Sequence, residues 1–246
     1  MQSGLGSGTS GQGGALLLKV LFGKICEEVK DEPADVEKWQ TRVNKNEQTV
    51  YFKLYPAITG YVQKLERRDS DWGGFFDITL TRERIPVVGE IPWRLSISEN
   101  SAEMSSILTR IEGVDFDKPL EIKPYSFKDE ATDKERRGLT LKQFDENAGK
   151  VVILKNLYDK DNPIIKEFPQ PFINKTGRNK GKWNFEAYED FQYTRLDDVI
   201  EKVSVLAAQR GSIEAQQAPE QQTAEKAQKD VELNQQQTEA PDDLPF

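Results

Sequence analysis

The chain of 246 residues contains no histidine and only one cysteine, Cys26. An intramolecular disulfide is therefore impossible, as are histidine-dependent catalytic triads and zinc sites built from cysteine and histidine. Cys26 lies in an apolar-rich stretch, which predicts a packed thiol rather than a nucleophile. The sequence also lacks the roughly 18–20 consecutive apolar residues of a membrane-spanning helix, and no basic region precedes an apolar run near its N-terminus. We therefore expect a cytosolic protein.

Negative charge is concentrated toward the C-terminus. The formal net charge is −8, and residues 211–246 hold eight acidic residues and two lysines. That segment accounts for −6 of the total, which leaves residues 1–210 close to neutral. A nearly neutral body can still carry a basic groove for a polyanion, so the acidic composition does not argue against a nucleic-acid ligand.

Composition divides the chain into three parts. Residues 1–14 are rich in glycine and serine and are expected to form a flexible arm. Residues 15–210 carry the periodic apolar patterns of a folded domain. Residues 211–246 are dominated by Gln, Glu, Ala, Thr and Pro, a composition that predicts disorder.

Most of the central part has the pattern of strands. Residues 15–29 contain a continuous apolar run that predicts a buried strand, with a short buried helix as the alternative. Residues 30–47 are charged and are expected to form a connection, and residues 159–185 a loop. Alternating or compact apolar runs predict further strands at residues 50–55, 58–65, 75–81, 93–98, 120–127, 137–144 and 151–154.

Two segments have helical periodicity instead. Apolar residues within 104–111 recur on one stripe, with Asn100 and Glu103 as an N-terminal signal and Gly113 as the stop. A second amphipathic stripe over residues 196–207 predicts a helix that packs on the strand-rich domain.

The order of strands, one helix and further strands is the connectivity of an OB-fold, a small five-stranded barrel. We therefore expect a mainly β protein. Its domain would be an elaborated OB-fold barrel with one short internal helix and a C-terminal amphipathic helix, flanked by disordered tails. Because there are more than five strand segments, such a barrel needs long bent strands or added hairpins.

Two windows combine aromatic rings with positive charge. In residues 50–55 the core-facing positions alternate with a Tyr-Lys-Tyr set, and residues 175–185 form the most basic window, which two aromatic residues end. Rings can stack on bases while cations neutralise phosphates, so both windows favour single-stranded DNA. Packing beneath a loop and a solvated hairpin tip are the alternatives. The residues predicted to contact DNA are Tyr51, Lys53, Tyr55, Trp72, Arg136, Arg137, Lys175, Arg178, Lys180, Lys182 and Trp183.

The chain ends in two carboxylates followed by an apolar plug: Pro241, Asp242, Asp243, Leu244, Pro245 and Phe246. These six residues resemble the C-terminal tip of bacterial-type single-stranded DNA-binding proteins, in which an acidic run precedes Ile- or Leu-Pro-Phe. The resemblance implies that the tip docks in a basic-rimmed apolar pocket on replication, recombination or repair proteins. Here the acidic run is short, and the body is larger than that family's barrel. The resemblance thus implies a divergent relative such as bacteriophages encode.

The sequence therefore predicts non-enzymatic, largely sequence-independent binding of single-stranded DNA, with no cofactor and no metal. One alternative is a metal-dependent nuclease that uses Asp117 and Glu121, with Lys123 beside them. Another is a protein–protein adaptor that binds no nucleic acid. Residues 177–182 do not form a phosphate-binding loop, because only three residues separate the glycines and Trp183 replaces the required Ser or Thr.

Overall fold

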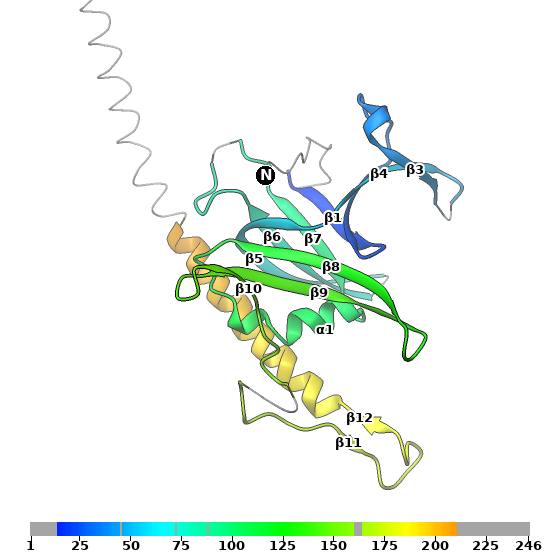
Figure 1. Ribbon diagram of the computed structural model, residues 1–246, viewed down its shortest axis with the longest axis vertical. Helices are drawn as coiled ribbons and strands as arrows, with labels where there is room; N and C mark the ends of the chain where they lie inside the picture. The colour runs from blue at the N-terminus through cyan, green and yellow to red at the C-terminus, as the bar shows by residue number, and fades with distance from the viewer. Residues whose placement is uncertain (1–13, 45, 72, 88, 160–163, 211–246) are drawn as a thin grey trace, which may run out of the picture. The chain divides into compact units, whose positions relative to one another are not determined.

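The computed structural model describes residues 14–44, 46–71, 73–87, 89–159 and 164–210. It is mainly β, with one large mixed sheet, a short internal helix and a C-terminal helix (Figure 1). This confirms the expected mainly β class with two helices. Residues 1–13 of the expected arm and the whole expected tail, residues 211–246, lie outside the described residues. The described residues up to Ser204 belong to one compact unit.

The elements follow one another in a strand-rich order that the internal helix interrupts. The strands are β1 (Leu16–Leu21), β2 (Lys24–Val29), β3 (Gln40–Val43), β4 (Thr49–Tyr55), β5 (Ile58–Ser70), β6 (Gly73–Thr81), β7 (Trp93–Ser98), β8 (Leu120–Asp129), β9 (Lys134–Asp145), β10 (Lys150–Ile153), β11 (Phe172–Ile173) and β12 (Trp183–Asn184). The helical elements are η1 (Val36–Lys38), α1 (Ala102–Leu108), η2 (Ile111–Gly113) and the C-terminal helix, residues 186–210.

The large sheet has the strand order β10-β9-β8-β5-β6-β7-β1-β2-β4-β3. Its neighbouring strands run antiparallel except β1 and β7, which are parallel. The sheet curls so that β2 approaches β8, and a Cβ added to Gly23 would lie 2.6 Å from the backbone nitrogen of Ser126. The sheet is therefore barrel-like, with the β1–β2 hairpin meeting β8.

The core lies on the inner face of this curved sheet. Strand alternation sets Phe76 and Ile78 of β6 beside Ile97 and Leu95 of β7, and all four side chains are at most 3% exposed. Helix α1 packs against β9 and contributes Met104 to the interior (Figure 1). Burying such side chains stabilises the fold by roughly 1.5–3 kcal/mol each.

The N-terminal apolar run forms a hairpin rather than the single strand expected over residues 15–29. Phe22 and Gly23 have φ values of 53° and 65°, and they join β1 to β2 in a two-residue turn. Two positive φ values give the turn a twist that matches paired strands. Gly23 was the only signal for this turn, because phenylalanine rarely adopts a positive φ.

Other expectations needed smaller corrections. The segment expected as a connection contains β3 and η1, and the expected loop over 159–185 contains the short β11–β12 hairpin. β5 continues to Ser70 because its polar end pairs with β6. The cap of α1 is Ser101 rather than Asn100, since its side chain accepts a hydrogen bond from Met104 N. In each case a tertiary partner or a local cap outweighed the apolar pattern.

An aromatic cluster anchors the C-terminal helix. Tyr158, only 4% exposed, makes edge-to-face contacts with Tyr188 and Phe191 of that helix. Its hydroxyl donates to Glu112 at 3.1 Å, and Arg195 donates to the same carboxylate through two nitrogens. Burial, followed by the nearby Glu112 charge, raises the pKa of Tyr158 to about 12. The helix thus packs on the sheet domain, as expected.

Candidate nucleic-acid interface

A groove of about 650 Å³ lies on the outer face of the sheet, across β6, β7, β1 and β2. Register explains its position. Leu17 lies beside Arg94, and Lys19 lies beside Ser96, so these residues share the face opposite to buried Leu18. The groove is lined by Leu17, Leu18, Lys19, Cys26, Glu28, Lys30, Arg68, Phe75, Arg94 and Ser96.

Charge in this lining is strongly biased. It contains four cationic side chains and a single carboxylate, Glu28, in a chain whose formal net charge is −8. Positive charge collected in a groove focuses the potential and attracts anions even when the molecule as a whole is acidic. The lining therefore favours a polyanionic ligand.

Arg68 and Phe75 form a combined cationic and aromatic surface in the groove. They are direct partners across β5 and β6, and the guanidinium carbon lies 5.2 Å from the ring centroid. Arg68 Nε also donates to Asp77 at 3.3 Å, and Asp77 is fully buried. Ser96 donates to the other oxygen of Asp77 at 2.5 Å. Asp77 therefore fixes Arg68 beside the ring.

Arg94 is a groove cation whose position favours an added anion. Its Nε is buried without a hydrogen-bond partner, and its guanidinium makes no ion pair with any residue that the structure describes. An unmatched buried donor costs stability that an incoming phosphate oxygen can offset. Arg94 is thus suited to bind a phosphate.

Lys19 and Arg42 share one carboxylate at the edge of the groove. Lys19 Nζ lies 2.8 Å from Glu28, and an Arg42 nitrogen lies 2.5 Å from it. Burial acts to raise the pKa of Glu28, but hydrogen bonds from these two cations outweigh it and lower the pKa. Because Lys19 and Arg42 share the single carboxylate of Glu28, this edge of the groove has a net positive charge.

Cys26 forms part of the groove floor as a buried side chain. It is fully buried, and burial raises the pKa of its thiol to about 11. A thiol with so high a pKa is a poor nucleophile at neutral pH. The expected packed thiol is confirmed.

The predicted Tyr-Lys-Tyr set lies on the other side of the sheet. The register places Lys53 beside Glu27, which shares its face with the core residue Leu18. Lys53 Nζ lies 4.0 Å from the Trp39 ring centroid and 3.7 Å from Asp35. These three predicted residues are therefore separated from the groove by the thickness of the sheet.

Tyr55 and Tyr51 have a partly buried environment on that side. The Tyr55 hydroxyl donates to Glu27 at 2.7 Å, and burial followed by that hydrogen bond raises the pKa of Tyr55. Tyr51 is half-buried and lies beside Val29. Of the residues expected in the core from the same strand, Val50 and Phe52 are buried, and Leu54 is half-buried.

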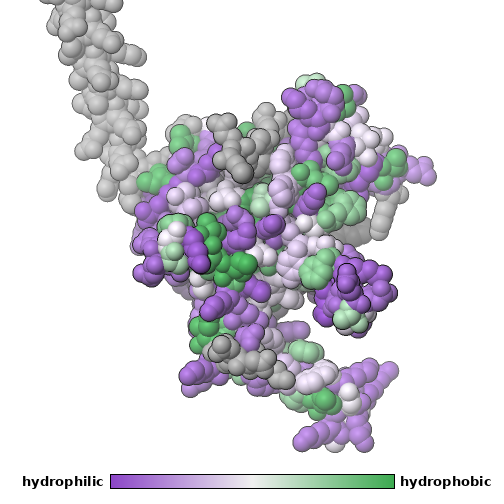
Figure 2. Space-filling model, in the orientation of Figure 1, coloured by the Kyte–Doolittle hydropathy of each residue, from purple (hydrophilic) through white to green (hydrophobic). Residues whose placement is uncertain are grey.

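Arg136 and Arg137 lie on the β8–β9 hairpin. Both arginines are exposed, and each forms an ion pair: Arg136 lies 3.1 Å from Asp129, and Arg137 lies 3.6 Å from Glu135. Hydrophilic residues gather at the turn of this hairpin in Figure 2. The β5–β6 turn carries Trp72, which lies outside the described residues.

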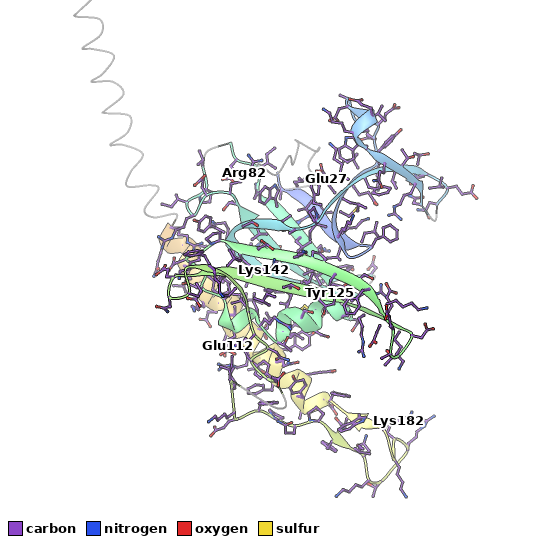
Figure 3. All side chains as sticks on the ribbon, in the orientation of Figure 1. Glu27, Arg82, Glu112, Tyr125, Lys142 and Lys182 are labelled. Carbon is purple, nitrogen blue, oxygen red and sulfur yellow. The ribbon has the colours of Figure 1, made fainter. Side chains whose placement is uncertain are left out.

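The predicted basic window forms the β11–β12 hairpin. Positive φ values at Gly177 (79°) and Gly181 (81°) shape its turn, and the side chain of Lys182 marks it in Figure 3. Trp183 is 59% exposed, and its ring centroid lies 6.2 Å from that of Phe185. The exposed cations of this hairpin are Lys175, Arg178, Lys180 and Lys182.

The predicted docking tip, Asp242, Asp243, Leu244, Pro245 and Phe246, lies outside the described residues. No helix in the described ranges is both long and apolar enough to span a membrane.

The carboxylates of the nuclease alternative have separate partners. Asp117 is paired with Arg84 at 2.5 Å, and Glu121 with Lys142 at 2.7 Å. Among the residues with described positions, no three Cys, Asp or Glu side chains are grouped to hold a metal ion.

Sequence reasoning missed five residues of the groove: Lys19, Lys30, Arg68, Phe75 and Arg94. A weak signal was present, because Arg94 stands between two core residues, Trp93 and Leu95, and must point outward. The sequence could not show that β1 lies beside β7, and this pairing places Lys19 beside Ser96 on the face that also carries Arg94. Comparisons of the chain with protein-family models, curated proteins and solved structures found no match.

Proposed function

We propose that this protein binds single-stranded DNA along the outer groove, with little sequence preference and without catalysing a reaction. The observation that carries the proposal is the lining, which combines the cations of Arg94, Arg68 and Lys19 with the Phe75 ring in a chain of net negative charge. Rings stack on bases of any sequence, and cations bind the backbone between them. Each stacked base contributes roughly 1–3 kcal/mol.

The strand order supports an elaborated OB-type barrel as the framework. Strands β5 to β9 are arranged as β7-β6-β5-β8-β9, with α1 between β7 and β8. That is five strands with a helix between the third and fourth. The N-terminal β1–β2 hairpin lies beside β7 and reaches β8, so it enlarges the barrel.

The position of the groove also supports this framework. Such barrels bind oligonucleotides on the face of their second and third strands, flanked by the loops between strands 1 and 2 and strands 4 and 5. The corresponding elements here are β6 and β7, the β5–β6 turn with Trp72, and the β8–β9 hairpin with Arg136 and Arg137. The flanking loops would extend the bound strand beyond the groove.

The rest of the proposal concerns recruitment. The terminal residues 242–246 would dock on replication, recombination or repair proteins of a bacterial host, while the groove holds DNA. The resemblance of the last six residues to bacterial-type tips supports this division. The anionic tail would also compete with DNA for cationic surfaces, because both carry negative charge.

Fluorescence anisotropy with labelled oligo-dT tests the groove directly. Arg94→Gln removes a cation that has no ion-pair partner among described residues, and Phe75→Leu removes a ring while keeping an apolar side chain. Each should lower affinity about tenfold. Lys150→Gln on the edge strand β10 removes one exposed charge far from β1 in the strand order and should change affinity little.

Three outcomes separate the candidate functions. A wild-type protein that leaves oligo-dT unbound would favour the adaptor. Cleavage of the DNA in the presence of magnesium would favour the nuclease. Tight binding that both groove variants retain, with unchanged melting temperatures, would move the DNA site elsewhere on the protein.

A further inference from the structure

Phe22 is the most exposed large hydrophobic side chain of the described residues, at 71%. It occupies the turn of the β1–β2 hairpin with a φ of 53°. A bulky residue at positive φ is a conformational outlier, and outliers of this kind concentrate at ligand sites. Neither its exposure nor its backbone conformation stabilises the fold.

The turn itself requires a positive φ at both positions, for which Asn-Gly is the favoured pair. Gly23 meets this requirement and also rests against the backbone of β8 at Ser126. Phe22 meets it poorly. An aromatic ring is therefore exposed to solvent at a position where asparagine would adopt the positive φ more readily.

The turn continues one wall of the groove. β1 runs parallel to β7 with Lys19 beside Ser96, so Leu21 and Phe22 extend toward the end of the groove where Phe75 pairs with Ser98. Lys24, the first residue after the turn, is exposed and makes no ion pair with a described residue. The Phe22 ring and the Lys24 cation therefore lie close together in the chain at this end of the groove.

We propose that Phe22 stacks on a base of single-stranded DNA where the strand leaves the groove, and that Lys24 contacts the adjoining phosphate. The inference rests on the proposed function, because it names one more contact of the same DNA strand. Stacking does not read the base, so the contact adds affinity without sequence preference.

The proposal predicts opposite effects on stability and binding for one substitution. Phe22→Asn suits the positive φ and should raise the melting temperature by about 2–4 °C. It removes the ring and should lower oligo-dT affinity about tenfold. Phe22→Tyr keeps a ring and the strain, so both quantities should stay near the wild-type values. Lys24→Gln should weaken binding and make it less dependent on salt.

Glu47→Asn is the matched control for strain. Glu47 has a φ of 59° in another turn and carries no ring. Its replacement should raise the melting temperature similarly and should not lower DNA affinity.

The outcomes of this experiment separate failure of the inference from failure of the proposed function. If Phe22→Asn binds oligo-dT like wild type, while Arg94→Gln is weakened, the inference is wrong and the proposed function stands. If wild type does not bind, the proposed function fails. If Phe22→Asn lowers the melting temperature, the ring supports the fold, and its assignment as a DNA contact is overturned.

Discussion

At the scale of single residues, Gly23 shows how backbone and packing requirements coincide. Its φ of 65° favours glycine, and an added Cβ would meet the backbone of Ser126 at 2.6 Å. Backbone atoms of a paired strand cannot move aside as a flexible side chain can. The contact between the N-terminal hairpin and β8 therefore depends on the absence of a side chain here.

Gly23→Ala should destabilise the protein by at least about 2 kcal/mol, since it combines left-handed strain with a steric clash. Urea denaturation measures this change. Gly149→Ala is the matched control, because Gly149 has a φ of 60° and an added Cβ would meet nothing within 4 Å. That control should cost only about 1 kcal/mol. Equal losses in the two variants would show that the approach to β8 is unimportant.

Glu27 is a buried carboxyl group with an unsatisfied oxygen. Its Oε2 accepts from Tyr55, while Oε1 has no hydrogen-bond partner, and burial raises its pKa above the ordinary value of 4.5. Figure 3 labels this side chain. The native state therefore holds the proton more tightly than the unfolded chain does. Ionisation then costs stability as pH rises from about 4.5 through the folded pKa.

Glu27→Gln should stabilise the protein by about 1 kcal/mol at pH 7, and the gain should shrink as pH falls toward 4.5. Denaturation curves across this pH range measure it. Glu28→Gln is the adjacent control with the opposite sign, because the pKa of Glu28 is lowered and its ionised form stabilises the fold. A gain for Glu27→Gln that did not vary with pH would exclude ionisation as its cause.

At the scale of elements, hairpins carry much of the proposed binding surface. The sheet supplies the groove, while the β8–β9 and β11–β12 hairpins present cations at their turns. The β11–β12 hairpin pairs only two residues on each strand, Phe172 with Asn184 and Ile173 with Trp183. Its exposed cations can therefore change without loss of the core.

The double variant Lys180→Gln/Lys182→Gln should keep the melting temperature within about 2 °C, because both side chains are exposed. It should lower affinity for oligo-dT. If each lysine contacts one phosphate, the slope of log affinity against log salt concentration should become less negative by about 1.4. Lys150→Gln/Lys166→Gln is the charge-matched control on other exposed positions. An equal effect of both pairs would indicate general charge rather than a hairpin contact.

At the scale of the whole molecule, charge is separated along the chain. Residues 211–246 carry most of the net negative charge, whereas the groove lining is positive. A ligand with phosphates and a polyanionic tail would favour the same cations. Partner docking and DNA binding should therefore respond differently to changes at the terminus.

Deleting residues 241–246 should abolish capture of repair or replication proteins from a bacterial extract, while DNA affinity stays equal or rises at low salt. Phe246→Ala keeps both carboxylates and should lose capture without changing DNA affinity. A shortened protein that lost DNA binding and retained its partners would contradict the proposed division.

The DNA affinity of the wild-type protein should fall steeply as the salt concentration rises. An affinity that did not change with salt would contradict the proposed phosphate contacts.

Local patterns in the sequence were sufficient for most of the elements. Trp93, Leu95 and Ile97 alternate into the core as expected, and Leu196, Val199 and Val203 are buried on one stripe of the C-terminal helix. These predictions succeed because side-chain direction repeats every two residues in a strand and every 3.6 in a helix. Basic composition also marked the window over residues 175–185, in which Lys175, Arg178, Lys180 and Lys182 are exposed.

Only the tertiary structure decided which strands are neighbours and which outward faces join. The parallel pairing of β1 with β7 brings Lys19 beside Ser96 and Leu17 beside Arg94, although these residues are far apart in sequence. The β1–β2 and β2–β4 pairings place the predicted Lys53 on the face opposite to the groove. The alternation of each strand is a local property, whereas strand pairing depends on burial and hydrogen bonding summed over the whole sheet.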